Sequence, residues 1–171
     1  AAEARRKAKE AAQAKAQRKA EEAARAEAQR KADEGVAQAQ ARKKTACEVL
    51  EEAEKKMDID VIVDVMAQHR DSTKVQQEGC HALWNVAANN PATRPTIAEK
   101  GGIEAVFHAM TQHSHHEQVQ EEGCWVMGYM VYLESARPAI RKGKAVMDAA
   151  RNNFPNNDDI QDYLKDVYAN I

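Results

Sequence analysis

The chain has 171 residues, which is enough for one domain, or for one domain with an extension. Hydrophobic residues make up 43% of it, and no stretch approaches the roughly 20 apolar residues of a membrane-spanning helix. The net charge of −2 hides an uneven distribution. Residues 1–44 hold thirteen Lys and Arg against seven Asp and Glu, whereas the remainder holds twelve against twenty. A basic segment joined to an acidic one can dock on its own chain, on an acidic partner or on an anionic surface.

Three cysteines, Cys47, Cys80 and Cys124, are too few for a disulfide framework, and the last two each follow a glycine. A small buried side chain suits such a position, so we expect inert core thiols rather than redox or metal chemistry. This favours an intracellular, reducing compartment, either the cytoplasm or an organelle, and a chain that is neither secreted nor transmembrane. Because the first residue is not methionine, we expect a piece of a longer or processed protein, although removal of a start methionine gives the same beginning.

Residues 1–57 have the composition of one long helix. They contain no proline and a single glycine, Gly35, and strong helix formers dominate. Alanine recurs at every fourth position from Ala4 to Ala32. A stripe of methyl groups buries too little area, at about 25 cal/mol per Å², for a tight leucine-type coiled coil. We predict a long single or coiled-coil helix, here called the rod, which is either solvated or lies along another helix or protein surface. Gly35 is able to kink or end it.

The rod is also the candidate for contact with an anionic surface. Its basic residues are interleaved with acidic ones and lack aromatic neighbours for stacking on bases, so the signal for nucleic acid or a membrane is weak. The candidate contact residues are its adjacent cations: Arg5, Arg6, Lys7, Arg18, Lys19, Arg30 and Lys31.

The end of the rod, Thr45–Met57, differs from the rest. Apolar residues recur there at helical spacing on one face, namely Ala46, Val49, Leu50, Ala53 and Met57. This pattern predicts an amphipathic cap helix that packs against the residues that follow. We therefore place a domain boundary after residue 57.

The second part of the chain, residues 58–171, repeats itself at an offset of 44 residues. The run Val75–Cys80 falls on Val119–Cys124, and Ile59 falls on Ile103. A period in the forties built from helical patterns is typical of an α-solenoid, in which repeats stack on one another. The fold class is therefore predicted to be all-α.

Each unit is expected to contain a short first helix, a glycine turn and two longer helices. The units are placed at about 58–90, 91–134 and 135–171, and the first and last are incomplete. Apolar spacing and turn residues predict these helices: Ile59–His69, Ser72–Asn89, Ala92–Lys100, Ile103–His113, Glu117–Leu133 and Asp158–Ile171.

This arrangement resembles the armadillo repeat, through the short-helix, glycine-turn, long-helix pattern and the run Gly79–Ala87. The resemblance covers residues 58–171, about two and a half repeats. HEAT repeats are the nearest alternative, but they lack the short first helix. The resemblance implies a right-handed superhelix whose third helices line a concave groove. Members of the family are non-enzymatic scaffolds and adaptors that bind extended peptides or other proteins there.

The family's binding residues carry over only in part. Nuclear-import adaptors of this family use, on each third helix, a Trp followed four residues later by an Asn that clamps the peptide backbone. The Asn place is filled here by Asn85, Tyr129 and Asn170. The Trp place is filled by His81, Trp125 and Asp166. No unit has both residues.

We expect the groove to bind a partner protein through these third-helix residues: His81, Trp84, Asn85, Glu121, Trp125, Tyr129 and Asn170. Trp84 falls on Gly128 of the next unit, and its ring is expected to fill the space that the glycine leaves. Aromatic residues spaced four apart on a helix are more often core than site. Partly buried packing between units is therefore the competing interpretation for Trp125 and Tyr129.

Other constellations carry little chemistry. His113, His115, His116 and Glu117 lie close in sequence, but no further ligand is spaced to complete a closed metal site. The sequence shows no phosphate-binding loop and no catalytic set. We expect no cofactor, metal or small-molecule substrate, and no enzyme activity.

We predict a non-enzymatic scaffold or structural subunit of a large complex, in which the repeats bind one partner protein and the rod bridges to another. Stacks of this kind generally need at least three repeats, so the rod, a missing part of the chain or a partner is expected to complete the core. One alternative is a transport adaptor that takes basic peptide cargo in the groove. The other is a tether to an anionic membrane or nucleic acid through the rod.

Overall fold

The computed structural model describes the backbone of residues 2–171 and the side chains of residue 15 and of residues 17–35 and 45–171. The described chain is all-helical and contains no strand, which confirms the predicted class. It divides into two compact units, Ala1–Arg42 and Lys43–Ile171. The division falls inside the first helix, earlier than the boundary that the sequence predicts after residue 57.

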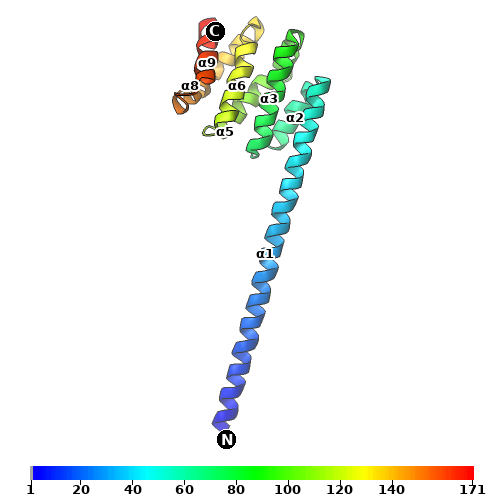
Figure 1. The fold of residues 1–171 in the computed structure, drawn as a ribbon, viewed down its shortest axis with the longest axis vertical. Coiled ribbons are helices and arrows are strands. Elements are labelled where there is room, and N and C mark those ends of the chain that lie inside the picture. Colours follow the sequence, from blue (N-terminus) through cyan, green and yellow to red (C-terminus); the bar gives the residue numbers. More distant parts are fainter. Residues whose placement is uncertain (1) are drawn as a thin grey trace. The chain divides into compact units, whose positions relative to one another are not determined.

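Helix α1 (Ala2–Lys56) accounts for the first unit and for the beginning of the second (Figure 1). It continues through Gly35, so the glycine does not end the helix. A Cβ at Gly35 would meet no atom within 4 Å, which means that no packing contact requires a glycine there. Among the predicted rod contacts, Arg5, Arg6 and Lys7 lie outside the described side chains, and the exposed ones are Arg18, Lys19, Arg30 and Lys31.

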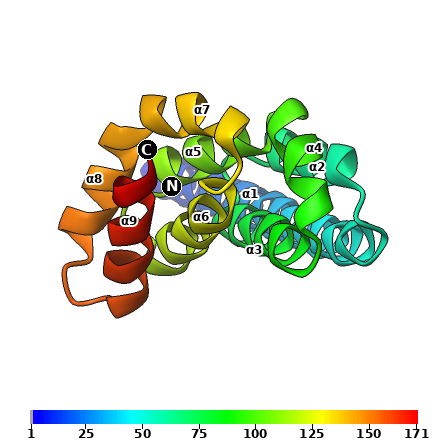
Figure 2. The same ribbon diagram turned by 90° about the horizontal axis from the view of Figure 1, so that it is seen from above.

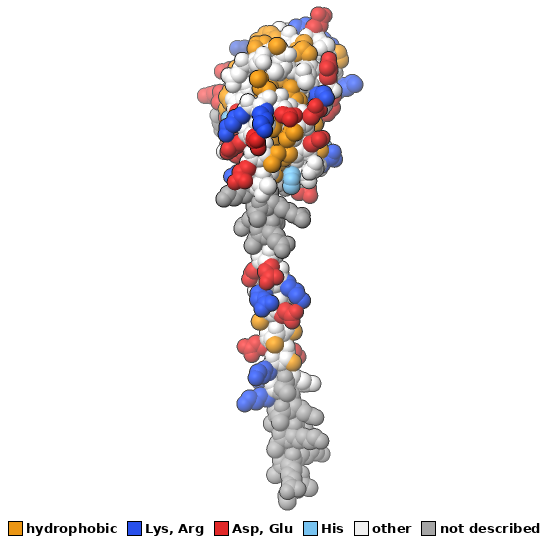
Figure 3. All heavy atoms as spheres, turned by 90° about the vertical axis from the view of Figure 1, so that its right-hand side faces the viewer, with side chains coloured by type: hydrophobic (Ala, Val, Ile, Leu, Met, Phe, Trp, Pro, Cys, Tyr) orange, Lys and Arg blue, Asp and Glu red, His pale blue; other side chains and the backbone are white. Residues whose placement is uncertain are grey.

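Local charge pairs accompany the described part of the first unit. Lys31 lies 2.7 Å from Glu27, and Arg30 lies 3.8 Å from Glu34, each one helical turn away. Figure 3 shows the resulting alternation of positive and negative side chains along this stretch. Exposed pairs of this kind contribute only about 0.3–0.5 kcal/mol each, so helix propensity supplies most of the stability here.

Pairs of longer helices, joined by short ones, make up the second unit. The helices after α1 are α2 (Ile59–Gln68), α3 (Thr73–Asn89), η1 (Pro91–Thr93), α4 (Arg94–Glu99), α5 (Gly102–Gln112), α6 (Glu117–Met130), η2 (Glu134–Ala136), α7 (Arg137–Lys142), α8 (Lys144–Asn153) and α9 (Asp158–Asn170). Side-chain caps set several starts: Ser72, Asn90 and Asn157 each accept a hydrogen bond from a backbone N–H in the first turn that follows. The predicted helix Ala92–Lys100 is split into η1 and α4, and the predicted Glu117–Leu133 ends three residues earlier.

The second unit has two layers of helices (Figure 2). Helices α3, α6 and α9 lie side by side in one layer, and α2, α5 and α8 pack against them in the other. The fully buried side chains of the core include Ile62, Leu83, Met110, Met127 and Leu164. At about 25 cal/mol per Å² of buried apolar area, this core is the main source of stability.

The predicted cap face is buried only in part. Ala46, Leu50 and Ala53 at the end of α1 belong to the core, whereas Val49 is 37% exposed and Met57 is 49% exposed. Met57 has a φ of 55°, in the left-handed region, so the chain leaves the helical path there and its side chain leaves the predicted face. The cap is therefore a three-residue contact rather than a five-residue one.

One glutamine recurs in all three helix pairs and fixes the turn between the layers. Gln76 Nε2 donates to the main-chain carbonyls of Met66 and His69, at 2.9 and 3.1 Å. The equivalent bonds in the next two pairs, between 2.9 and 3.1 Å long, run from Gln120 to Met110 and His113, and from Gln161 to Arg151 and Phe154. The carbonyls lie at helix C-termini, where intrahelical partners are missing. We call this contact the glutamine lock.

Two glycines let the layers approach closely. A Cβ built on Gly79 would lie 2.4 Å from Met66 Cγ, and one built on Gly123 would lie 2.7 Å from Met110 Cγ. Each glycine costs the helix about 1 kcal/mol relative to alanine. The repeated methionine contact is the packing reason for both glycines.

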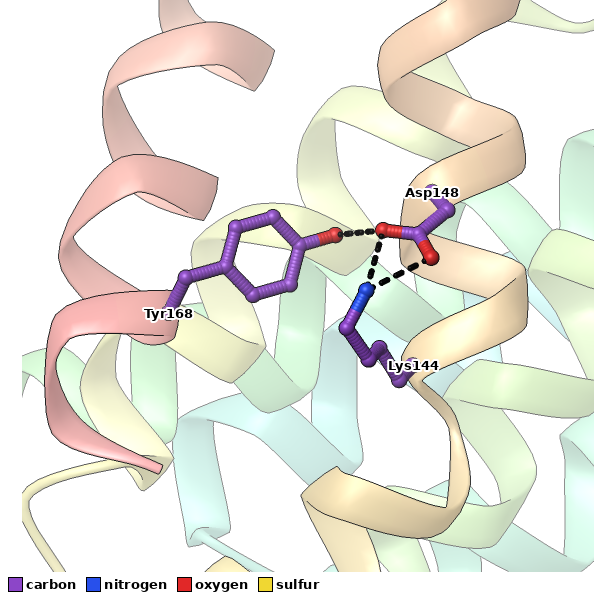
Figure 4. Close-up of polar contacts among 3 residues, drawn as sticks. All are labelled: Lys144, Asp148 and Tyr168. Carbon is purple, nitrogen blue, oxygen red and sulfur yellow. Dashed lines mark hydrogen bonds and ion pairs between the residues drawn. The ribbon is translucent and has the colours of Figure 1, made fainter.

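A polar contact ties the last two helices together (Figure 4). The Tyr168 hydroxyl on α9 donates to Asp148 Oδ1 on α8 at 2.7 Å, and Lys144 Nζ lies 3.0 and 2.7 Å from the two carboxylate oxygens of Asp148. The hydrogen bond from Lys144 is the largest cause that holds the pKa of Asp148 below its ordinary value. Burial, followed by the bond to Asp148, raises the pKa of Tyr168. All three side chains are engaged with one another, so we interpret the cluster as a structural tie.

Candidate protein-binding surface

Five rings from α3, α6 and α9 form a continuous set, here called the aromatic surface: His81, Trp84, Trp125, Tyr129 and Tyr163. The Trp84 and Trp125 ring centroids are 4.8 Å apart, and those of His81 and Trp84 are 5.2 Å apart in an edge-on arrangement. Tyr163 lies 6.3 Å from Trp125 and 6.5 Å from Tyr129. Aromatic pairs at such distances contribute about 0.5–1.5 kcal/mol beyond the area that they bury. The rings therefore hold one another in place.

Helical spacing explains why these rings adjoin. Trp84 follows His81 by three residues and Tyr129 follows Trp125 by four, so each pair lies on one face of its helix. Because α3, α6 and α9 lie side by side, the three faces meet. All five rings are half-buried. The rings pack between neighbouring repeats, as expected if they are packing groups. They also leave apolar area exposed, as the anchors of protein interfaces do.

The two indole N–H groups at the centre of the aromatic surface are unsatisfied. Nε1 of Trp84 and Nε1 of Trp125 are buried and have no hydrogen-bond partner among the described residues. A buried donor without a partner costs about 1–3 kcal/mol. The aromatic surface thus combines packed rings with polar groups that the chain itself does not satisfy.

The space beside Gly128 is filled by Tyr163, not by Trp84, which corrects the expectation from the sequence. A Cβ on Gly128 would lie 2.4 Å from Cδ1 of Tyr163. Trp84 is on the neighbouring helix α3, and its ring contacts Trp125 instead. The glycine of α6 therefore accommodates a ring of α9, the helix that packs beside it.

Other predicted contact residues are bonded within the chain. Asn85 Nδ2 donates to Glu54 Oε1 at the end of α1, at 2.9 Å. Glu121 Oε2 accepts from Asn157 Nδ2 at 2.8 Å. Asn170, at the end of α9, donates to its own helix at the Asp166 carbonyl, at 2.8 Å. The structure thus brings His81, Trp84, Trp125 and Tyr129 together in one surface and gives Asn85, Glu121 and Asn170 local partners.

Glu122 was missed by the sequence reasoning, which singled out its neighbour Glu121. Its side chain is only 10% exposed, between α3 and α6, and it lies one turn before Trp125. Burial raises the pKa of its carboxyl group to about 7, and the charges of Glu78 and Glu121 act in the same direction, against a hydrogen bond from Gln77. The available signal was its register: Glu122 falls on Glu78 and precedes Trp125 by three residues.

Tyr163 and Arg94 were missed as well. The Arg94 guanidinium lies 5.5 Å from the centre of the Tyr129 ring, a cation–π distance, and its Nε donates to the Ala87 carbonyl at 3.0 Å. Arg137 repeats the second of these bonds, to Val131 at 3.0 Å. That recurrence is visible in the sequence as Arg-Pro at both places. Tyr163 has no aromatic equivalent in the earlier units, so the repeat gives no signal for it.

Two hollows in the described structure lie away from the aromatic surface. One, of about 270 Å³, lies between α2 and α5 and is lined by Val63, Met66, Ala67, Arg70, Gln76, Gly101, Glu104, Ala105 and His108. None of these residues was predicted to contact a partner.

A second hollow lies at the end of the second unit where α1 meets α2. It measures about 160 Å³ and is lined by Val49, Glu52, Ala53, Lys56, Asp58 and Val61. The face that carries the end of α1 and α2 is turned to the viewer in Figure 3, where hydrophobic side chains gather among charged ones. Exposed Val49 and Met57 add to its apolar area.

His113, one of the histidines that lie close together in the sequence, forms hydrogen bonds within the chain. Its Nε2 donates to the Arg70 carbonyl at 2.9 Å, so its Nδ1 accepts from the Thr73 hydroxyl at 3.1 Å. Within the part of the chain whose side chains are described, no group of three or more His, Cys, Asp or Glu side chains is arranged to hold a metal ion. His113 therefore joins the end of α5 to the loop before α3.

Comparison with models of protein families, with curated proteins and with solved structures found no match for this chain. In the described residues, no helix combines the length and the apolar character that crossing a membrane requires.

Proposed function

We propose that this chain is a non-enzymatic scaffold, a short armadillo-like α-solenoid whose aromatic surface docks a partner protein and whose long helix reaches a second one. The observation that carries this proposal is the aromatic surface itself. It places two half-buried tryptophans and two tyrosines on three adjacent helices, with two unsatisfied indole donors at its centre. Trp and Tyr are the residues most often found as anchors in protein interfaces.

The repeated contacts support the solenoid part of the proposal. The glutamine lock recurs in all three helix pairs, and the glycine–methionine contact recurs in two of them. Units that share their internal contacts and pack on their neighbours are the building principle of solenoids. Val49 and Met57 are exposed at the end of the second unit that is formed by α1 and α2. A further helix pair or a partner would continue the stack there.

The long helix supports the bridging part. Its described side chains in the first unit, residue 15 and residues 17–35, are exposed and carry both signs of charge. A helix that is polar all round serves to connect parts of an assembly or to lie on a complementary charged surface.

Crosslinking mass spectrometry on the native assembly, purified through the full chain at physiological salt, tests this function. We expect crosslinks from Lys15, Lys19 or Lys31 to one protein and from Lys74 or Lys165 to another. Trp125→Ala should remove the second protein, whereas Tyr132→Ala, at an aromatic residue that is 56% exposed and outside the aromatic surface, should retain it. Equal recovery with both variants would contradict docking at the aromatic surface.

A basic peptide adaptor is the second candidate. The observation that favours it is the acidic border of the aromatic surface, where Glu78 and Glu121 adjoin the buried Glu122. We expect micromolar binding (Kd on the order of 1 µM) of a Lys- and Arg-rich peptide if this candidate holds, weakened at least tenfold by Trp125→Ala. An acidic peptide of the same length is the control. Titration calorimetry at low and high salt separates this candidate from the scaffold, which would not bind free basic peptides.

A further inference from the structure

Glu122 occupies an unusual position for a carboxyl group. It lies between α3 and α6, below the aromatic surface, with only 10% of its side chain exposed. Its Oε1 accepts a hydrogen bond from Gln77 Nε2 at 3.4 Å and lies 3.6 Å from His81 Nδ1. Its Oε2 is buried and has no hydrogen-bond partner among the described residues. One of the two oxygens is therefore unsatisfied when the group is ionised.

The surroundings of Glu122 disfavour a negative charge. From α3, the carboxylate of Glu78 and the buried thiol of Cys80 face the same region, and from its own helix α6, Glu121 adds a second negative charge. Helix α5 contributes the apolar side chains of Val106 and Met110 beside Gly123.

The remaining neighbours of Glu122 give its charge little compensation. Helix α9 contributes Tyr163 to the aromatic surface and Asn157 to Glu121. His81 is the basic side chain beside Glu122, and its ring also forms the edge contact with Trp84. A move of the Glu122 carboxylate toward His81 would therefore act on a ring that contacts Trp84.

We infer that Glu122 is a proton-operated switch of the aromatic surface: the neutral carboxyl group keeps α3 and α6 closely packed, and its ionisation loosens the contact between Trp84 and Trp125. A neutral carboxyl group costs much less to bury than an ionised one, which in the same place requires water or a cation. The described residues supply two weak partners for Oε1, Gln77 and His81, and no hydrogen-bond partner for Oε2. Burial raises the pKa of the carboxyl group to about 7, so the switch operates near neutral pH.

This inference goes beyond the proposed function and needs no partner, so the two can fail separately. Trp84 and Trp125 are the two tryptophans of the chain, and both belong to the aromatic surface. Intrinsic tryptophan emission of the full chain therefore reports on this site alone.

The test is a titration of emission and acrylamide quenching from about pH 5 to about pH 9. We expect a red shift and stronger quenching as the pH rises, with one midpoint near the pKa of about 7. Glu122→Gln should abolish the transition, because glutamine cannot ionise. Glu121→Gln should retain it. A wild-type chain without a transition, or a transition that persists in Glu122→Gln, would overturn the inference.

A second measurement covers the case in which Glu122→Gln does not fold. Carboxyl-carbon NMR of the wild-type chain, labelled at its glutamate side chains, should show one resonance that titrates near neutral pH. If every glutamate resonance titrates below about pH 5, the switch does not exist.

Discussion

The rings of Trp84 and Trp125 lie with their centroids 4.8 Å apart although the two residues are not equivalent in the repeat. Trp84 falls on Gly128, and Trp125 falls on His81, which also contacts Trp84. The pair therefore joins two neighbouring repeats through positions that are not equivalent in the repeat. A contact of this kind links neighbouring helices directly, so a change at either ring is felt on both.

Glu122→Gln should stabilise the second unit at about pH 8 by about 1–2 kcal/mol and leave its stability nearly unchanged at about pH 4. In the folded chain the pKa of Glu122 is raised from 4.5 to about 7. Between these values the folded state binds more protons than the unfolded state, so wild-type stability falls as the pH rises. The expected gain is smaller than the full pKa difference implies, because solvent screens part of the site.

Urea unfolding followed by circular dichroism, at both pH values, measures this difference. Glu121→Gln is the matched control, since Glu121 is adjacent and half-buried. A gain of equal size at both pH values would attribute the effect of Glu122→Gln to packing rather than to ionisation.

Gln120→Ala should destabilise the second unit by about 2 kcal/mol. It removes a buried amide that donates to the carbonyls of Met110 and His113, which are left without these bonds. Gln118→Ala, at an exposed position two residues earlier on the same helix, should change stability by less than about 0.5 kcal/mol. Equal effects in chemical denaturation would show that the glutamine lock contributes nothing beyond helix propensity.

Alanine substitutions at two glycines should have opposite effects. Gly35→Ala should raise the helical signal of the chain, because its Cβ meets no atom within 4 Å and alanine is favoured over glycine in a helix by about 1 kcal/mol. Gly128→Ala should cost about 1–3 kcal/mol, since its Cβ would lie 2.4 Å from the Tyr163 ring.

Circular dichroism and thermal unfolding read out both changes, and tryptophan emission should shift only in Gly128→Ala, because Tyr163 contacts Trp125. A stable Gly128→Ala variant with unchanged emission would mean that Tyr163 moves aside at no cost.

The three thiols should differ in reactivity in the native chain. Burial raises the pKa of the Cys80 thiol and raises that of Cys124 to about 12, and both side chains are fully buried. Cys47 is half-buried, and its pKa is raised mainly by burial. A thiol reagent such as Ellman's should therefore modify Cys47 first, and the other two only in denaturant. If all three cysteines reacted at the same rate in buffer without denaturant, the burial of Cys80 and Cys124 would be contradicted.

Much of the fold follows from local chemistry that a sequence displays. Alanine-rich composition predicts α1, and apolar spacing predicts both ends of α2, α3, α5 and α9 to within one residue. The split of one short helix into η1 and α4, and the exposure of Met57, depend on backbone geometry at single residues. Periodicity does not encode that geometry.

The candidate site was less accessible from the sequence. His81, Trp84, Trp125 and Tyr129 could be named because they lie on expected third helices. Which rings meet is decided by the relative placement of helices: Tyr163, thirty-eight residues after Trp125, completes the aromatic surface. Glu54, far away in the chain, likewise takes up the amide of Asn85. Such partners belong to other helices, so a pattern within one helix cannot identify them.

The glutamine lock has a consequence for how this chain can change length. In each helix pair the glutamine reaches carbonyls ten and seven residues before it, so the pair is a fixed module. The distance between successive glutamines, by contrast, is 44 residues and then 41, so variation falls in the connections. Tandem duplication of one module would add a helix pair that already contains its own glutamine lock. Growth in whole helix pairs, rather than in single helices, is the step that this architecture admits.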